Sequence, residues 1–290
     1  MFRVLRLPAH AGSFYPARKD DVIKSIEWCF THRLGPGVKP SGLGPERLSY
    51  AYIVPHAGYM YSGPTAAHAY LWLSRERRPE IVILVGPNHT GLGLAVSVYR
   101  EGYWRTPLGD VEVDSEIGKL IVEYTGFAAF DEKAHLYEHS LEVQIPFLQY
   151  IYGSNFKITP ITIMAQIPSI SRGLAEAFLK IVEDNGVDAI LIATSDLNHY
   201  EPHDISVKKD LMVIEEVLEP DPEGIFKVIE EYNVSVCGPG PMAIATYIAK
   251  IKGVKPVLLA HSTSGDVTGE KDFVVGYTSI RIPRGRGFEV

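Results

Sequence analysis

Two continuous runs of branched aliphatic residues constrain the fold of this 290-residue chain most strongly. They read IVILV at residues 81–85 and AILIAT at residues 189–194, and neither alternates polar with apolar residues. A strand covered on one face alternates in this way, whereas a strand covered on both faces does not. The two runs therefore predict parallel strands in the middle of a sheet that has helices on both faces.

Segments with strand and helix patterns alternate along the rest of the chain. The expected strands are residues 50–54, 81–85, 95–99, 157–163, 189–194, 255–260 and 273–280. The expected helices are residues 20–32, 64–73, 114–124, 141–150, 169–184, 204–218, 222–232 and 239–252. This order predicts a single α/β domain over residues 1–290, with a mostly parallel or mixed central sheet flanked by helices.

Several helix starts carry recognisable signals. Pro64 and Pro222 are expected at first helical positions, where the missing N–H group costs little. Ser169 or Ser171 is expected to cap the helix that begins near residue 169.

Charge and composition narrow the class of partner. The net charge of −7 and the pI of about 5.8 argue against nucleic acid or an anionic membrane as the main partner, because both need a basic surface. Two cysteines do not make a disulfide scaffold, and no apolar run approaches the ~18 residues of a membrane span. We expect a cytoplasmic protein without a signal peptide. Scarce glutamine and asparagine beside frequent proline point to a thermophile.

Polar side chains follow four of the expected strands at the point where each strand ends. These residues are His56, His89, the pair Asp196 and His199, and Asp266. In open α/β sheets, ligands bind beyond the carboxyl ends of the strands. We therefore expect these side chains to converge on one site, although each histidine taken alone also fits a structural role.

The types of residue in this set indicate a metal site. Two imidazoles and one carboxylate form the facial triad of non-haem Fe(II) proteins, so His56, His89 and Asp266 are expected to bind Fe(II). Zinc accepts the same atoms, spacing does not decide between the two metals, and a site without metal is the third alternative. His199, with its ring oriented by Asp196, is expected to act as a general base.

Six short blocks of the sequence, taken together, resemble the signature of the Memo family. They are AHAGSFY at residues 9–15, PHAGYMYSG at 55–63, GPNH at 86–89, EHSLE at 138–142, SDLNH at 195–199 and CG at 237–238. One block alone is unspecific, but the ordered set is specific and covers most of the chain. The resemblance implies the fold of class III extradiol dioxygenases, which bind Fe(II) through two histidines and a carboxylate and cleave catechol rings.

The resemblance also implies roles for individual residues. His56 and His89 match the two ligand histidines, and His199 matches the catalytic histidine of the dioxygenases. Asp196 is the companion acid on the same loop, and Asp266 is the nearest acid for the third ligand position.

The remaining expectations concern the pocket and the reaction. Tyr61, Glu138 and His139 are expected to line a substrate pocket. Cys237 is either a buried structural cysteine or a thiol whose pKa is lowered by the start of a helix. A metal-dependent, dioxygenase-like oxidase acting on an unknown substrate is the first function expected. The alternatives are a binding or adaptor protein that holds a peptide or small ligand in the same pocket, and a zinc-dependent hydrolase. The oligomeric state stays open, a homo-oligomer included.

Overall fold

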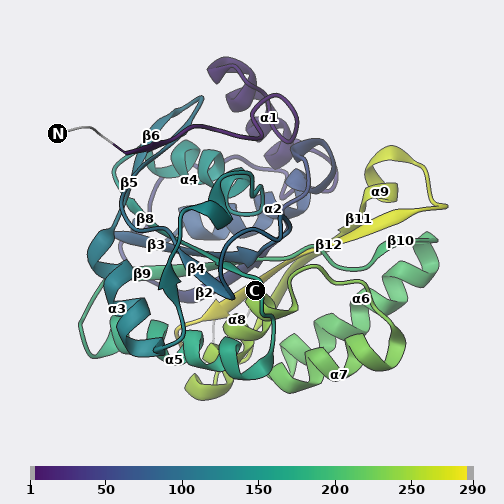
Figure 1. The fold of residues 1–290 in the computed structure, drawn as a ribbon. Coiled ribbons are helices and arrows are strands. Elements are labelled where there is room, and N and C mark those ends of the chain that lie inside the picture. The colour runs from purple at the N-terminus through teal and green to yellow at the C-terminus, as the bar shows by residue number, and fades with distance from the viewer. Residues whose placement is uncertain (1–3, 286–290) are drawn as a thin grey trace.

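The computed structural model describes residues 4–285, and within that range twelve strands form one mixed sheet (Figure 1). The strands are β1 Leu5–Arg6, β2 Ser49–Val54, β3 Ile81–Pro87, β4 Val96–Val98, β5 Gly102–Thr106, β6 Gly109–Val113, β7 Ala129–Phe130, β8 Lys157–Ile163, β9 Ala189–Thr194, β10 His199–Glu201, β11 Val257–Thr263 and β12 Val274–Pro283. The main path through the sheet is β1-β5-β6-β8-β3-β9-β2-β12-β10. β11 lies beside β12, β4 beside β8, and β7 beside β4.

The middle of the sheet is parallel, as the aliphatic runs predict. β8, β3, β9 and β2 are parallel neighbours, and every residue of β2, β3 and β9 is buried. β12 runs antiparallel to both β2 and β11. β11 therefore points the same way as β2 but is separated from it by one strand.

Helices cover both faces of the sheet. They are α1 Lys19–Thr31, α2 Tyr59–Ser74, α3 Ser115–Thr125, α4 Ile145–Tyr152, α5 Pro168–Glu183, α6 His203–Leu218, α7 Pro222–Tyr232, α8 Pro239–Lys252 and α9 Ser264–Thr268, with short 3-10 turns at Lys133–His135 and Glu142–Gln144. One apolar core contains residues of α1, α2 and α4, and the other contains residues of α3, α5, α7 and α8 (Figure 1). Neighbouring residues of β2 serve opposite cores: Tyr52 belongs to the first and Ile53 to the second. The expected α/β fold with a mixed sheet is confirmed.

Two of the three predicted helix-start signals are wrong, and the helix expected over residues 141–150 begins only at Ile145. α2 begins at Tyr59, so that Pro64 lies inside the helix. The chain enters this helix directly after Gly58, whose carbonyl oxygen already accepts a hydrogen bond from the amide of Ser62. α5 begins at a proline after Ile167, and neither predicted serine caps it. Pro222 does occupy the first turn of α7, as expected.

A buried histidine away from the strand ends makes the stability of this fold sensitive to pH. His135 is fully buried, and its Nε2 atom donates to the carbonyl oxygen of Ser97 at 3.2 Å. Burial, with a smaller contribution from the Arg6 guanidinium, lowers the pKa of His135 to about 3. An unfolded histidine binds a proton near pH 6.5. Between these two values the unfolded chain binds more protons than the native chain, so the native state loses stability as the pH falls.

We expect the variant His135→Phe to lose less stability in acid than the wild type. When the pH falls from 7 to 4, the wild type should lose about 3 kcal/mol more unfolding free energy than the variant. Urea denaturation at each pH measures the two losses. Equal losses in the two proteins would show that His135 is not held neutral in the native state.

Candidate metal site

Two of the expected ligands follow parallel strands that share one neighbour in the sheet. His56 follows β2 after a single proline, and His89 follows β3 after a single asparagine. β9 lies between these strands and pairs with both, so their carboxyl ends meet at one edge of the sheet. The rings of His56 and His89 lie with their centroids 5.1 Å apart. The strand-end pattern thus brings these two imidazoles together.

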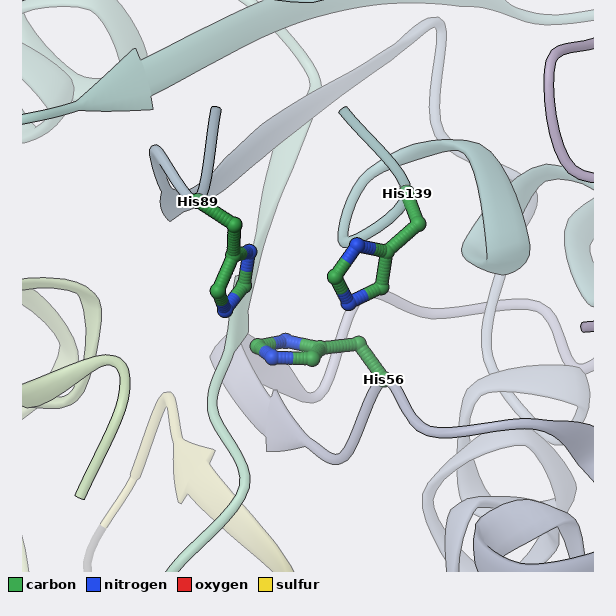
Figure 2. Close-up of side chains that lie close together, drawn as sticks. All are labelled: His56, His89 and His139. Carbon is green, nitrogen blue, oxygen red and sulfur yellow. The ribbon is translucent and has the colours of Figure 1, made fainter. Parts of the chain in front are cut away.

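The third donor of this group is His139, which lies between the two 3-10 turns. His56, His89 and His139 each offer a nitrogen within 4.8 Å of the other two, and their side chains point toward one another (Figure 2). The His139 ring stacks on that of His89, with 4.5 Å between centroids. The sequence places His139 in the pocket wall, and the structure puts it among the candidate ligands as well.

The structure does not bring Asp266 to this group. β11 continues to Thr263, three residues beyond its expected end, and Asp266 then lies in α9. Its Oδ2 atom accepts hydrogen bonds from the amide and the hydroxyl of Thr263, at 2.8 and 3.0 Å, in a capping box. Its Oδ1 atom lies 3.2 Å from Nε2 of His203. One carboxylate oxygen therefore closes the start of α9, and the other contacts the first residue of α6.

Glu138 lies behind His89 rather than in the wall of the cleft. This fully buried carboxylate accepts hydrogen bonds from the His89 amide at 2.7 Å and from His89 Nδ1 at 2.8 Å. Burial alone would raise the pKa of Glu138, but the hydrogen bond and charge of His89 outweigh it and lower the pKa to about 2. In the neutral ring, a proton held on Nδ1 by this carboxylate makes Nε2 the nitrogen that can bind a metal. This is the usual outer-shell support of a metal-binding histidine.

The other two imidazoles are held as neutral donors. Burial first, and then the neighbouring His89, keep the pKa of His56 well below its ordinary value. Burial and the His56 ring lower the pKa of His139 to about 3. Neutral imidazole nitrogens bind zinc, iron, copper and nickel. The donor set therefore fits a transition metal ion.

Cys237 is a second residue at the site, in addition to His139, that the strand-end pattern misses. Its Sγ atom lies 3.1 Å from Nε2 of His56 and 3.2 Å from the amide nitrogen of Asp196. It is followed by Gly238 and the start of α8, but burial and the nearby Asp196 raise the pKa of the thiol instead of lowering it. The only sequence signal for Cys237 was the CG block at residues 237–238, one of the six blocks of the family resemblance.

Asp196 and His199 both line the cleft, but their hydrogen bonds go to other partners, and Asp196 does not orient the His199 ring through one. Oδ1 of Asp196 accepts a hydrogen bond from the His56 amide at 2.8 Å, so this acid positions the His56 backbone. His199 Nδ1 lies 2.7 Å from the carbonyl oxygen of Ser235. Because a carbonyl only accepts, Nδ1 carries a proton, and in the neutral ring Nε2 is the nitrogen that can accept one.

An open cleft of about 680 Å³ leads to the three imidazoles. Its lining includes His56, His89, His139, Asp196, His199 and Tyr61. Glu138 and Asp266 are not among the lining residues. A cleft of this size accommodates a small ligand.

The sheet and the cleft together define an α/β protein with a histidine-rich site at the carboxyl edge of its parallel strands. The model of the Memo-like protein family matches residues 6–281, and the chain belongs to this family.

Named relatives cover nearly the whole chain. A MEMO1 family protein of Aeropyrum pernix is 56% identical over 96% of this chain and 99% of its own length. Another, from Sulfolobus acidocaldarius, is 52% identical over 96% of this chain and 99% of its own length. These relatives are archaeal, in keeping with the composition expected of a thermophile.

A solved structure is similar in fold. An uncharacterized protein from Escherichia coli K12 aligns with a TM-score of 0.54 at 13% identity, over 81% of this chain and all of its own. In the part of the chain that the structure describes, no helix is both long and apolar enough to cross a membrane.

Proposed function

We propose that this protein is a metal-dependent oxidoreductase of the dioxygenase-like type that acts on a small molecule or peptide in the cytoplasm. One observation carries the proposal: three imidazoles meet on the floor of an open cleft. His56, His89 and His139 would hold the ion, which supplies Lewis acidity and a redox centre when bound. Iron is our first choice because the sequence resembles a signature that implies the extradiol dioxygenase fold.

Residues of the chain prepare the site for this chemistry. Glu138 fixes the tautomer of His89 through the 2.8 Å hydrogen bond and so presents one unprotonated nitrogen. Asp196 holds the backbone of His56. His199 keeps its Nε2 atom free to accept a proton, and it lines the same cleft. A substrate hydroxyl bound between the imidazoles and His199 would lose its proton to that nitrogen.

A zinc-dependent hydrolase is the second candidate. Three histidines with open positions are a donor set that catalytic zinc uses. The donor group defined here contains no carboxylate among the described residues, which also separates it from the iron triad that the sequence predicts.

The test is reconstitution of anaerobically purified protein with Fe(II) or Zn(II). We expect oxygen uptake with phenolic substrates to require iron, and zinc not to replace it. His199→Gln should lower kcat by about 10²- to 10⁴-fold while the bound metal is unchanged. Ester hydrolysis supported by zinc, with no oxygen uptake in the iron form, would favour the hydrolase. A tightly bound protein partner retained by His56→Ala, with no turnover in any form, would favour an adaptor.

A further inference from the structure

Three large aromatic side chains stand exposed where the cleft opens to solvent. Tyr61 is 37% exposed, Tyr200 73% and Phe273 75%, and all three line the cleft. In contrast, His56 and Asp196 on the floor are 1% and 5% exposed. The aromatic residues come from α2, from β10 and from the segment before β12, and β10 lies beside β12 at one edge of the molecule (Figure 1). Exposed aromatic surface gathered around a cleft is typical of a ligand-binding site.

The backbone at Tyr200 is arranged to present its side chain. Tyr200 has a φ of 59°, a left-handed conformation that is uncommon for a residue other than glycine. It is the extra residue of an irregularity in the β10–β12 ladder, where His199 pairs with Val275 and Glu201 with Val274. Bulges and unfavourable φ values of this kind collect next to functional sites, where they redirect a side chain. The conformation supports a role for Tyr200 in contacting the ligand.

The charge at the mouth of the cleft selects against anions. None of its lining residues, all within the described chain, is lysine or arginine. Its carboxylates are Asp196, which already accepts from the His56 amide, and Glu270. Glu270 is exposed at the mouth, and no ion pair of its side chain is found among the described residues. An anionic group entering the mouth would meet negative charge and aromatic faces without a compensating cation.

We propose that the mouth of this cleft binds the ammonium group of a small phenol that carries an aminoalkyl chain. The ammonium group would lie between the rings of Tyr200 and Phe273 and the carboxylate of Glu270. Aromatic faces attract cations, and a nearby carboxylate adds to that attraction. This inference rests on the proposed function for the other end of the ligand. The donor group has no carboxylate to offset the charge of a bound metal ion, so the floor would repel an ammonium group and accept an oxygen donor. The ligand is therefore oriented with its amine outward and its oxygen inward.

The test uses three probes that share a phenol and differ in the charge of the tail. They are tyramine, 4-ethylphenol and 3-(4-hydroxyphenyl)propionate, and their Kd values are measured by calorimetry on metal-free and on zinc-loaded protein. We expect tyramine to bind on the order of fivefold more tightly than 4-ethylphenol, and the propionate to bind most weakly. Equal binding of the three probes, tighter binding of the propionate, or no binding of any probe would overturn the inference.

Variants locate the effect. Glu270→Gln and Phe273→Leu should each reduce the preference for tyramine to about twofold. Glu123→Gln, an exposed acid on α3 outside the cleft, should leave the preference unchanged. A preference that survives both cleft substitutions also overturns the inference. The metal-free arm keeps the two proposals apart. If the protein prefers tyramine but takes up no metal, only the proposed metal site is contradicted. If it takes up metal but binds the three probes equally, only the proposed ammonium site is contradicted.

Discussion

Replacing His89 by alanine is expected to abolish tight metal binding. The substitution removes one of three donors and leaves the buried Glu138 carboxylate without its imidazole partner. Loss of an outer-shell partner alone costs roughly 10- to 100-fold in metal affinity, and loss of a ligand should exceed that range. The measurement is a competition titration of Fe(II) or Zn(II) against a chromophoric chelator.

The matched control removes an imidazole elsewhere. His68 contacts the carbonyl oxygen of Leu34 through Nε2 at 3.0 Å and lies outside the cleft. A glutamine side chain can donate the same hydrogen bond to Leu34, so His68→Gln should bind metal with the affinity of the wild type. If His89→Ala and His68→Gln bound metal equally well, the three-imidazole group would not be the metal site.

Removing the buried cation Arg6 is expected to have the largest effect on stability. Arg6 is 4% exposed and donates to Oε2 of Glu142 at 2.7 Å, to the His135 carbonyl at 2.7 Å and to the Glu138 carbonyl at 3.0 Å. Arg6→Met leaves the buried Glu142 carboxylate without its counter-ion. Breaking a buried pair in this way costs about 3–5 kcal/mol of unfolding free energy. Urea denaturation at neutral pH measures the loss.

An exposed ion pair provides the comparison. Arg172 and Glu176 form a 2.8 Å pair on the surface of α5, with more than half of each side chain exposed. Such pairs contribute about 0.3–0.5 kcal/mol, so Arg172→Met should be nearly neutral. The double variant Arg6→Met with Glu142→Gln should recover part of the stability, since no buried charge is then left alone. A small loss for Arg6→Met, like that for Arg172→Met, would contradict this account.

The parallel centre of the sheet was predictable because its signal is local. IVILV and AILIAT are buried on both faces, and the residues that follow β2, β3 and β9 must lie at one edge. His56, His89, Asp196 and His199 reach the cleft for that reason. Short strands such as β1 and β7 have two residues each, and so few residues carry no periodicity.

The remaining candidate ligand was not predictable by the same reasoning, because it does not follow a strand. His139 is placed by its neighbour Glu138, which bonds to the backbone and ring of His89 across 49 residues of sequence. Asp266 was expected at a strand end, but a capping box turns its carboxylate back onto Thr263. Whether a polar residue after a strand faces the ligand or closes the next helix depends on local hydrogen bonds that spacing does not reveal.

The most direct test of the central claim is a crystal structure of the iron-loaded protein, prepared anaerobically, with anomalous data collected at the iron edge. We predict one anomalous peak per chain, at about 2.0–2.2 Å from one nitrogen each of His56, His89 and His139. A peak bound through Asp266, or no peak at the three histidines in protein that has taken up iron, would contradict the site described here.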